Sequence, residues 1–156
     1  MAQTISTDHF TSEFFAILNE TFEKVQGIFL DKGTSLFETL DTISAEVASR
    51  PVSENCASIA AQVEHIRYYL DVLGVYMQGQ KPENVDWKAI WNTVEAVTPE
   101  EWEASKSRLK TSYQAMLTLT KNFTWENTDE IGGAMAIVVH TAYHLGEIRQ
   151  ALCTVK

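Results

Sequence analysis

Three of the four histidines in this chain are spaced as the ligands of a metal ion would be. His140 and His144 lie four residues apart in AMAIVVHTAYHLGEIRQAL, a stretch with the apolar pattern of a helix. Because positions i and i+4 differ by only about 40° around a helix, both imidazoles leave one face, one turn apart. His65 lies in a second helical stretch, SIAAQVEHIRYYLDVLGVYM, and could supply a third nitrogen from a neighbouring helix. Three protein ligands leave a coordination position open, which is typical of a reactive site.

The position of these histidines on their helices favours a metal site over a chance spacing. Histidine pairs four residues apart also arise by accident, and a single helical histidine is usually a surface or hydrogen-bonded core residue. In both stretches, however, the histidines border the apolar stripe, so their rings could meet in a cleft between helices. The two stripes are Ile137, Thr141, Leu145, Ile148 and Leu152, and Ile59, Val63, Ile66, Leu70, Leu73 and Met77. We predict that the ring nitrogens converge to within about 3–4 Å of one another, around a point about 2.0–2.2 Å from each.

Other side chains with useful chemistry share these helix borders. Glu147 lies one turn beyond His144. Its carboxylate could accept a hydrogen bond from a ligand histidine, act as a general base on metal-bound water, or simply be a solvated charge. Tyr69 and Tyr76 share the helix edge of His65. They line a pocket beside the metal, as walls or hydroxyl donors, or they are ordinary aromatics at the rim of the core.

The sequence predicts four long helices to position these residues, because apolar residues recur at three-and-four spacing. The helices are expected at residues 8–30, 56–78, 99–121 and 127–153. The third has the clearest start: Thr98-Pro99-Glu100-Glu101 supplies an N-cap, a proline at the first helical position and a capping-box glutamate. Asn127 and Glu130 form a weaker capping box for the fourth helix. The buried stripe of the first is expected to be Phe10, Phe14, Ile17, Thr21, Val25 and Ile28.

The connections complete the expected fold. Residues 35–55 are a mixed connection with one or two short helical turns, and VDWKAIWNTV is expected to form another. Trp87 and Trp91 in that segment could cover the mouth of the site, although packing against the end of the bundle is the favoured interpretation. Four long helices with one extended connection between the first and the second predict an all-α fold, a four-helix bundle. We expect a single domain over residues 1–156.

Composition excludes several classes of function. The net charge is −9 and no basic stretch is available to neutralise phosphates, so we expect no binding to nucleic acid or to an anionic membrane surface. The N-terminus lacks the basic and apolar regions of a signal peptide, and no apolar run is long enough to span a bilayer. Cys56 and Cys153 fit no metal or redox spacing and are expected to be free thiols. These features predict a cytoplasmic protein.

The histidine pattern and helix order resemble those of the DinB/YfiT superfamily of small metal-binding four-helix bundles. HTAYHLGEIRQAL, with His140, His144 and Gly146, is similar to the family's closing H-x-x-x-H-R-G-Q-[IL] motif. His65 lies near the middle of the second predicted helix, and the similarity covers nearly all 156 residues. The resemblance implies that the three histidines bind a divalent metal (Zn, Ni, Fe or Mn), often in a homodimer. In the better understood branches, a low-molecular-weight thiol is the co-substrate.

Two departures from the motif bear on function. Leu145 stands where arginine is frequent, and Glu147 where glutamine is frequent.

We expect the open coordination position to bind a thiol or water and to lower its pKa. This predicts a metal-dependent enzyme, either a thiol-dependent transferase or a hydrolase acting on a small molecule. The alternatives are a metal- or ligand-binding bundle without turnover, and a structural homodimer whose site is unused. Wide apolar stripes on the first and fourth helices also favour a homodimer.

Overall fold

Helices make up all the regular secondary structure of residues 4–155, the part of the chain that the computed structural model describes. The long helices are α1 (Thr7–Phe22), α4 (Ile59–Met77), α5 (Pro99–Lys121) and α6 (Thr128–Val155). The short ones are α2 (Leu36–Leu40), α3 (Ala45–Ala48) and the 3-10 helix η1 (Ala89–Asn92). The prediction of an all-α fold is confirmed. Residues 1–3 and 156 of the predicted single domain lie outside the described residues.

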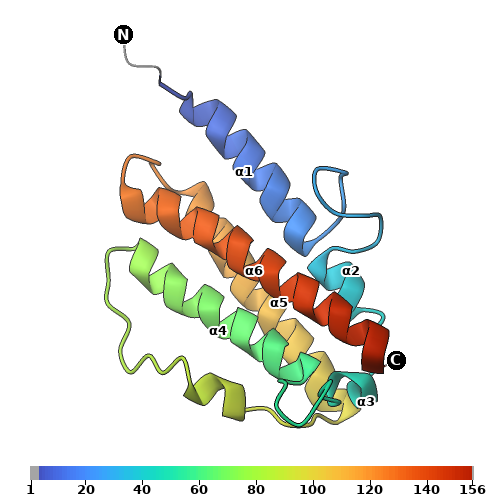
Figure 1. Ribbon diagram of the computed structural model, residues 1–156. Coiled ribbons are helices and arrows are strands. Elements are labelled where there is room, and N and C mark those ends of the chain that lie inside the picture. Colours follow the sequence, from blue (N-terminus) through green and yellow to red (C-terminus); the bar gives the residue numbers. More distant parts are fainter. Residues whose placement is uncertain (1–3, 156) are drawn as a thin grey trace.

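The long helices lie alongside one another (Figure 1). Helix α4 packs against both α5 and α6, and α1 packs against α6. The predicted stripes of α4 and α6 face the core; all of their members are buried except Leu73, which is partly buried and packs against the core. No helix among residues 4–155 combines the length and apolar character that a membrane span requires. The seam between α4 and α6 therefore joins two apolar stripes, and the three histidines lie along its border.

The start signals of the last two long helices are largely confirmed. The Thr98 hydroxyl accepts a hydrogen bond from the Glu101 backbone N–H (3.2 Å), and the Glu101 carboxylate accepts one from the Thr98 N–H (2.8 Å). At α6, Asn127 caps the helix by accepting from the Glu130 N–H (2.8 Å). The Glu130 carboxylate instead accepts from the Trp125 N–H (2.7 Å), so only half of the second capping box forms.

Helix α1 ends at Phe22 and does not continue to Leu30, so the predicted length was wrong. Beyond the helix the chain turns back, and Gly27, at φ 86°, adopts the left-handed conformation that glycine tolerates best. Val25 is only partly buried and Ile28 is 46% exposed, although both were expected in the buried stripe. The three-and-four spacing of apolar residues therefore continues into a segment that is not helical.

The buried carboxylate of Glu20 explains why the helix stops. It accepts hydrogen bonds from backbone N–H groups of residues 26–30, which we call the Glu20 loop. The donors are Gln26 (2.7 Å), Ile28 (2.9 Å), Phe29 (2.6 Å) and Leu30 (2.7 Å). Burial opposes ionisation, but the backbone hydrogen bonds outweigh it and lower the pKa of Glu20 to about 2. A single ionised side chain thus satisfies four backbone donors that a longer helix would have used internally.

Candidate metal centre

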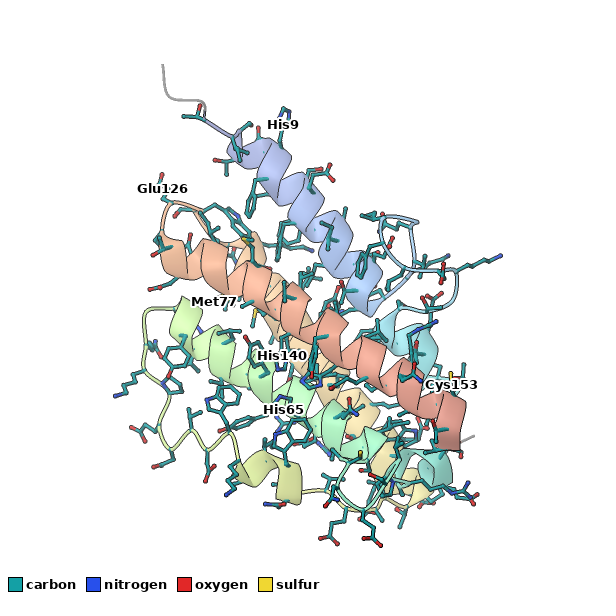
Figure 2. All side chains as sticks on the ribbon, viewed as in Figure 1. His9, His65, Met77, Glu126, His140 and Cys153 are labelled. Carbon is teal, nitrogen blue, oxygen red and sulfur yellow. The ribbon has the colours of Figure 1, made fainter. Side chains whose placement is uncertain are left out.

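The packing of α4 against α6 brings the three predicted ligands together. His65 comes from α4, and His140 and His144 come from successive turns of α6. One ring nitrogen of each lies within 4.8 Å of one from each of the others. The closest pair, Nε2 of His65 and Nε2 of His140, is 3.0 Å apart, and Figure 2 shows these two residues beside each other between the helices. The predicted convergence is confirmed for this pair, while the complete set spans a somewhat wider distance.

His144 is oriented by the carboxylate one turn further along α6. Its Nδ1 lies 2.8 Å from Oε2 of Glu147, so a neutral His144 donates its Nδ1–H to the carboxylate. The lone pair on Nε2 is then free. This carboxylate–histidine pair is the arrangement that commonly fixes the tautomer of a metal ligand and raises its basicity. Of the three roles considered for Glu147, the structure directly shows the hydrogen bond to a histidine.

The other two histidines are left with unsatisfied ring nitrogens. The Nδ1 atoms of His65 and His140 are both buried and have no hydrogen-bond partner among the described residues. Leaving a buried polar group without a partner costs about 1–3 kcal/mol. The 3.0 Å contact between the Nε2 atoms fits a single N–H···N hydrogen bond. It is also close to the roughly 3.3 Å expected between two nitrogens on one tetrahedral ion. The two Nε2 atoms are therefore close enough to share one ion, whereas the unpaired Nδ1 atoms point away from it and would not be its ligands.

All three imidazoles are held in the neutral form at neutral pH. Burial, together with a smaller contribution from the neighbouring His144, lowers the pKa of His65 to about 4, although Glu147 opposes the shift. Burial also lowers the pKa of His140 to about 3, with contributions from the two other histidines. For His144, burial lowers the pKa while Glu147 partly offsets the shift. Neutral imidazoles keep the lone pairs that a metal ion needs, so the donor set fits a divalent cation.

Aromatic rings cover the histidines on two sides. Tyr69 stacks on His140, with ring centroids 3.5 Å apart and planes 5° apart. Trp91 of η1 stacks on His65 at 4.1 Å and 20°, and Trp87 meets the same imidazole edge-on at 6.4 Å. The expectation that both tryptophans pack on the end of the bundle was therefore wrong. The segment between α4 and α5 folds back over the site, which helical periodicity could not reveal.

Tyr76 lies apart from this cluster. It is 44% exposed, and it follows His65 by three turns of α4, roughly 16 Å along the helix axis. The structure thus brings Tyr69 to the histidines and leaves Tyr76 near the far end of the helix. Both cysteines, Cys56 and Cys153, are free, as predicted, and the structure shows that both are exposed.

An open groove lies beside Glu147 and Trp91, which contact His144 and His65; the histidines themselves do not line it. It runs between the loop 52–57, the 3-10 helix η1 and the C-terminal half of α6, and its volume is about 990 Å³. Gly146 lies on its wall, where the missing side chain leaves the α6 backbone open. The sequence did not predict this groove, because its walls come from a loop, a connection and a helix that are distant along the chain. It provides space for a small molecule next to Glu147 and Trp91.

Comparison with known proteins finds no protein family, no curated protein and no solved structure that matches this chain.

Proposed function

We propose that His65, His140 and His144 bind one divalent metal ion, and that the loaded site catalyses a reaction of a small molecule in the adjoining groove. The observation that carries the proposal is the convergence of three imidazoles from two helices, with ring nitrogens within 4.8 Å of one another; His65 and His144 are buried and His140 is partly buried. Imidazole ligands suit Zn, Ni and Fe, and Mn remains a candidate. The same three positions support a fold of the DinB/YfiT type, a four-helix bundle built from α1, α4, α5 and α6.

The proposed reaction class is a thiol-dependent transfer or a hydrolysis. A bound ion would act as a Lewis acid that converts a thiol or water into a nucleophile at neutral pH. The Glu147 carboxylate accepts the Nδ1–H of His144, with Nδ1 and Oε2 2.8 Å apart. This hydrogen bond favours the His144 tautomer whose Nε2 is unprotonated. The stacked rings of Tyr69 and Trp91 fix His140 and His65 and exclude water from their faces. The groove leaves the Glu147 side open to substrate.

We also propose that the protein forms a homodimer. Helix α6 carries an exposed apolar row with four-residue spacing, Met135, Val139 and Tyr143, which are 54%, 67% and 61% exposed. Contiguous apolar exposure of this kind supports an interface with a second molecule. Light scattering at micromolar concentration should return twice the chain mass of 17.6 kDa, and a monomer mass would contradict the dimer.

Metal binding is tested by the thermal unfolding of purified protein. Titration with Zn²⁺, Ni²⁺, Fe²⁺ or Mn²⁺ should raise the melting temperature, because an ion that binds only the folded state stabilises it by about 2.7 kcal/mol at one hundred times its Kd. His144→Ala should abolish this gain. The matched control is His9→Ala, which removes the exposed fourth histidine from α1 and should keep the full gain. An unchanged melting temperature for the wild type with all four ions would remove the basis of the proposal.

Turnover separates an enzyme from a metal-binding bundle without activity. A screen of low-molecular-weight thiols with electrophilic substrates should give metal-dependent product with the wild type. Glu147→Gln should retain the metal, because the amide oxygen can still accept the His144 Nδ1–H, but it removes a base. A loss of about 10²–10⁴-fold in kcat with metal retained would assign proton transfer to Glu147. An unchanged rate would leave it only the role of orienting His144.

A further inference from the structure

The segment between α4 and α5 covers the histidines and is loosely attached to the rest of the protein. We call residues 81–96 the strap; Figure 1 shows it beside α4, against which its helix η1 packs. Ile90 is the only buried residue of the strap. One hydrogen bond joins it to the other described residues, from the Asp86 backbone N–H to the Tyr68 hydroxyl (3.2 Å), and no ion pair does. A segment with so few buried side chains and hydrogen bonds opens locally at a low cost in free energy.

Two indole rings attach the strap to the site itself. Trp91 stacks on His65, and its ring centroid is 5.8 Å from that of His144. Trp87 meets the ring of Tyr68 edge-on at 5.4 Å. The strap therefore rests on two of the proposed metal ligands and on the α4 residue that also accepts its hydrogen bond.

The same contacts close the way to the ring nitrogens. His65 and His144 are only 7% and 4% exposed, and the face of His140 is covered by Tyr69. Tyr69 belongs to α4, which is held in place by its packing against α5 and α6. Trp91 belongs to the strap, which has no such support. Of the two covers over the histidines, the strap is the one that can move without disrupting the packing of the long helices.

We propose that the strap swings away from α4 to admit the ion to the histidines, and that the stack of Trp91 on His65 holds it closed. Coordination makes an imidazole ring more electron-poor, and the face of an indole attracts positive charge, so the strap should close more tightly over a loaded site. The rate of ion uptake is then set by the opening of the strap rather than by diffusion. The role of the ion rests on the proposed function; the opening of the strap does not.

Opening is tested on metal-free protein at neutral pH with diethyl pyrocarbonate, which acylates accessible neutral imidazoles. Mass spectrometry of peptides gives the rate at each histidine. Trp91→Ala should raise the rate at His65 by about tenfold. The rate should change little at exposed His9 and at His140, which keeps its cover of Tyr69. Trp91→Phe retains a ring on His65 and should behave like the wild type. An unchanged rate at His65 in Trp91→Ala, or an equal rise at His65 and His140, would overturn the proposal.

A second pair of variants loosens the strap without removing a large side chain. Tyr68→Phe removes the one hydrogen bond between the strap and α4 and should raise the acylation rate at His65 by about twofold. Tyr76→Phe makes the same change at an exposed position about two turns further along α4 and should leave the rate unchanged. A faster reaction in both variants, or in neither, would count against the opening of the strap.

Rapid mixing with Zn²⁺, followed by tryptophan fluorescence, tests the link between the strap and the ion. In the wild type the observed rate should level off at high Zn²⁺ concentration, because opening becomes rate-limiting, whereas in Trp91→Ala it should continue to rise. A wild-type rate that stays proportional to Zn²⁺, with a higher melting temperature in Zn²⁺, would mean that the strap assignment fails and the metal centre stands. If Zn²⁺ changes neither signal while Trp91→Ala still speeds acylation of His65, the metal centre fails and the strap stands as a mobile cover.

Discussion

Two regions of this protein bury ionisable side chains and treat them in opposite ways. The Glu20 carboxylate is fully buried, and the backbone N–H groups of the Glu20 loop surround it, so the charge has partners supplied by its own chain. In the histidine cluster, His65 and His144 are buried and His140 is partly buried, yet the Nδ1 atoms of His65 and His140 have no hydrogen-bond partner among the described residues. The difference separates a polar group whose partners all come from the fold from two ring nitrogens that the fold leaves unpaired.

The largest loss of stability is expected on substitution of Glu20, whose carboxylate has hydrogen-bond partners from its own chain. Glu20→Ala removes the acceptor of four backbone hydrogen bonds at once, so those donors must find water or stay unpaired. Chemical denaturation should show the greatest decrease in the free energy of unfolding of any single variant discussed here. The control is Glu13→Ala, an exposed glutamate of α1, which should change stability little. A Glu20→Ala protein as stable as this control would show that the loop does not depend on the carboxylate.

In the histidine cluster, by contrast, we expect substitution to leave the free energy of unfolding unchanged or to raise it. The double variant His65→Phe/His140→Phe removes both unpaired Nδ1 atoms and keeps aromatic rings next to Trp91 and Tyr69. Without added metal it should be as stable as the wild type or up to about 2 kcal/mol more stable. It should also lose the metal-dependent gain in melting temperature. A loss of more than about 1 kcal/mol would mean that the histidines contribute to the fold in their own right.

Acid should lower the free energy of unfolding through the two regions in different pH ranges. Each of these decreases should be smaller than the effects of the substitutions above. The folded pKa values of His65 and His140 are lowered from 6.5 to about 4 and about 3, so the unfolded chain takes up their protons first. Stability should fall as the pH drops from about 6.5 towards 4 and 3. The pKa of Glu20 is lowered from 4.5 to about 2, so its contribution is complete above 4.5 and is lost as the pH drops towards 2.

Unfolding measured across this pH range can separate the two contributions. The double histidine variant should lack the upper part of the decrease, and Glu20→Gln should lack the lower part. A decrease of the same shape in both variants would show that other groups dominate acid unfolding.

The sequence was sufficient for the parts of the site that depend on local periodicity. Four-residue spacing placed His140 and His144 on one face, and their position at the stripe border placed them against α4. The start of α5 followed from Thr98 and Glu101, because a capping box is written entirely in neighbouring residues. Each of these features is decided within one or two helical turns, where sequence spacing and geometry coincide.

The features that the sequence did not reveal depend on contacts between distant segments. Helix α1 was extended too far because Val25 and Ile28 continue its apolar spacing, whereas the competing partner, Glu20, is a charged residue that periodicity counts as exposed. Trp91 was placed wrongly because a connection has no period from which its path could be inferred.

The packing of α4 against α6 also has a consequence for the degradation of the protein. His65 and His140 are separated by 75 residues of chain, which include the whole of α5. An ion held between them would act as a removable cross-link that closes this long loop without a covalent bond. Its loss would leave the hydrogen bonds of the helices intact and still raise the fraction of unfolded chains exposed to proteases. The abundance of the protein would then follow the supply of the metal.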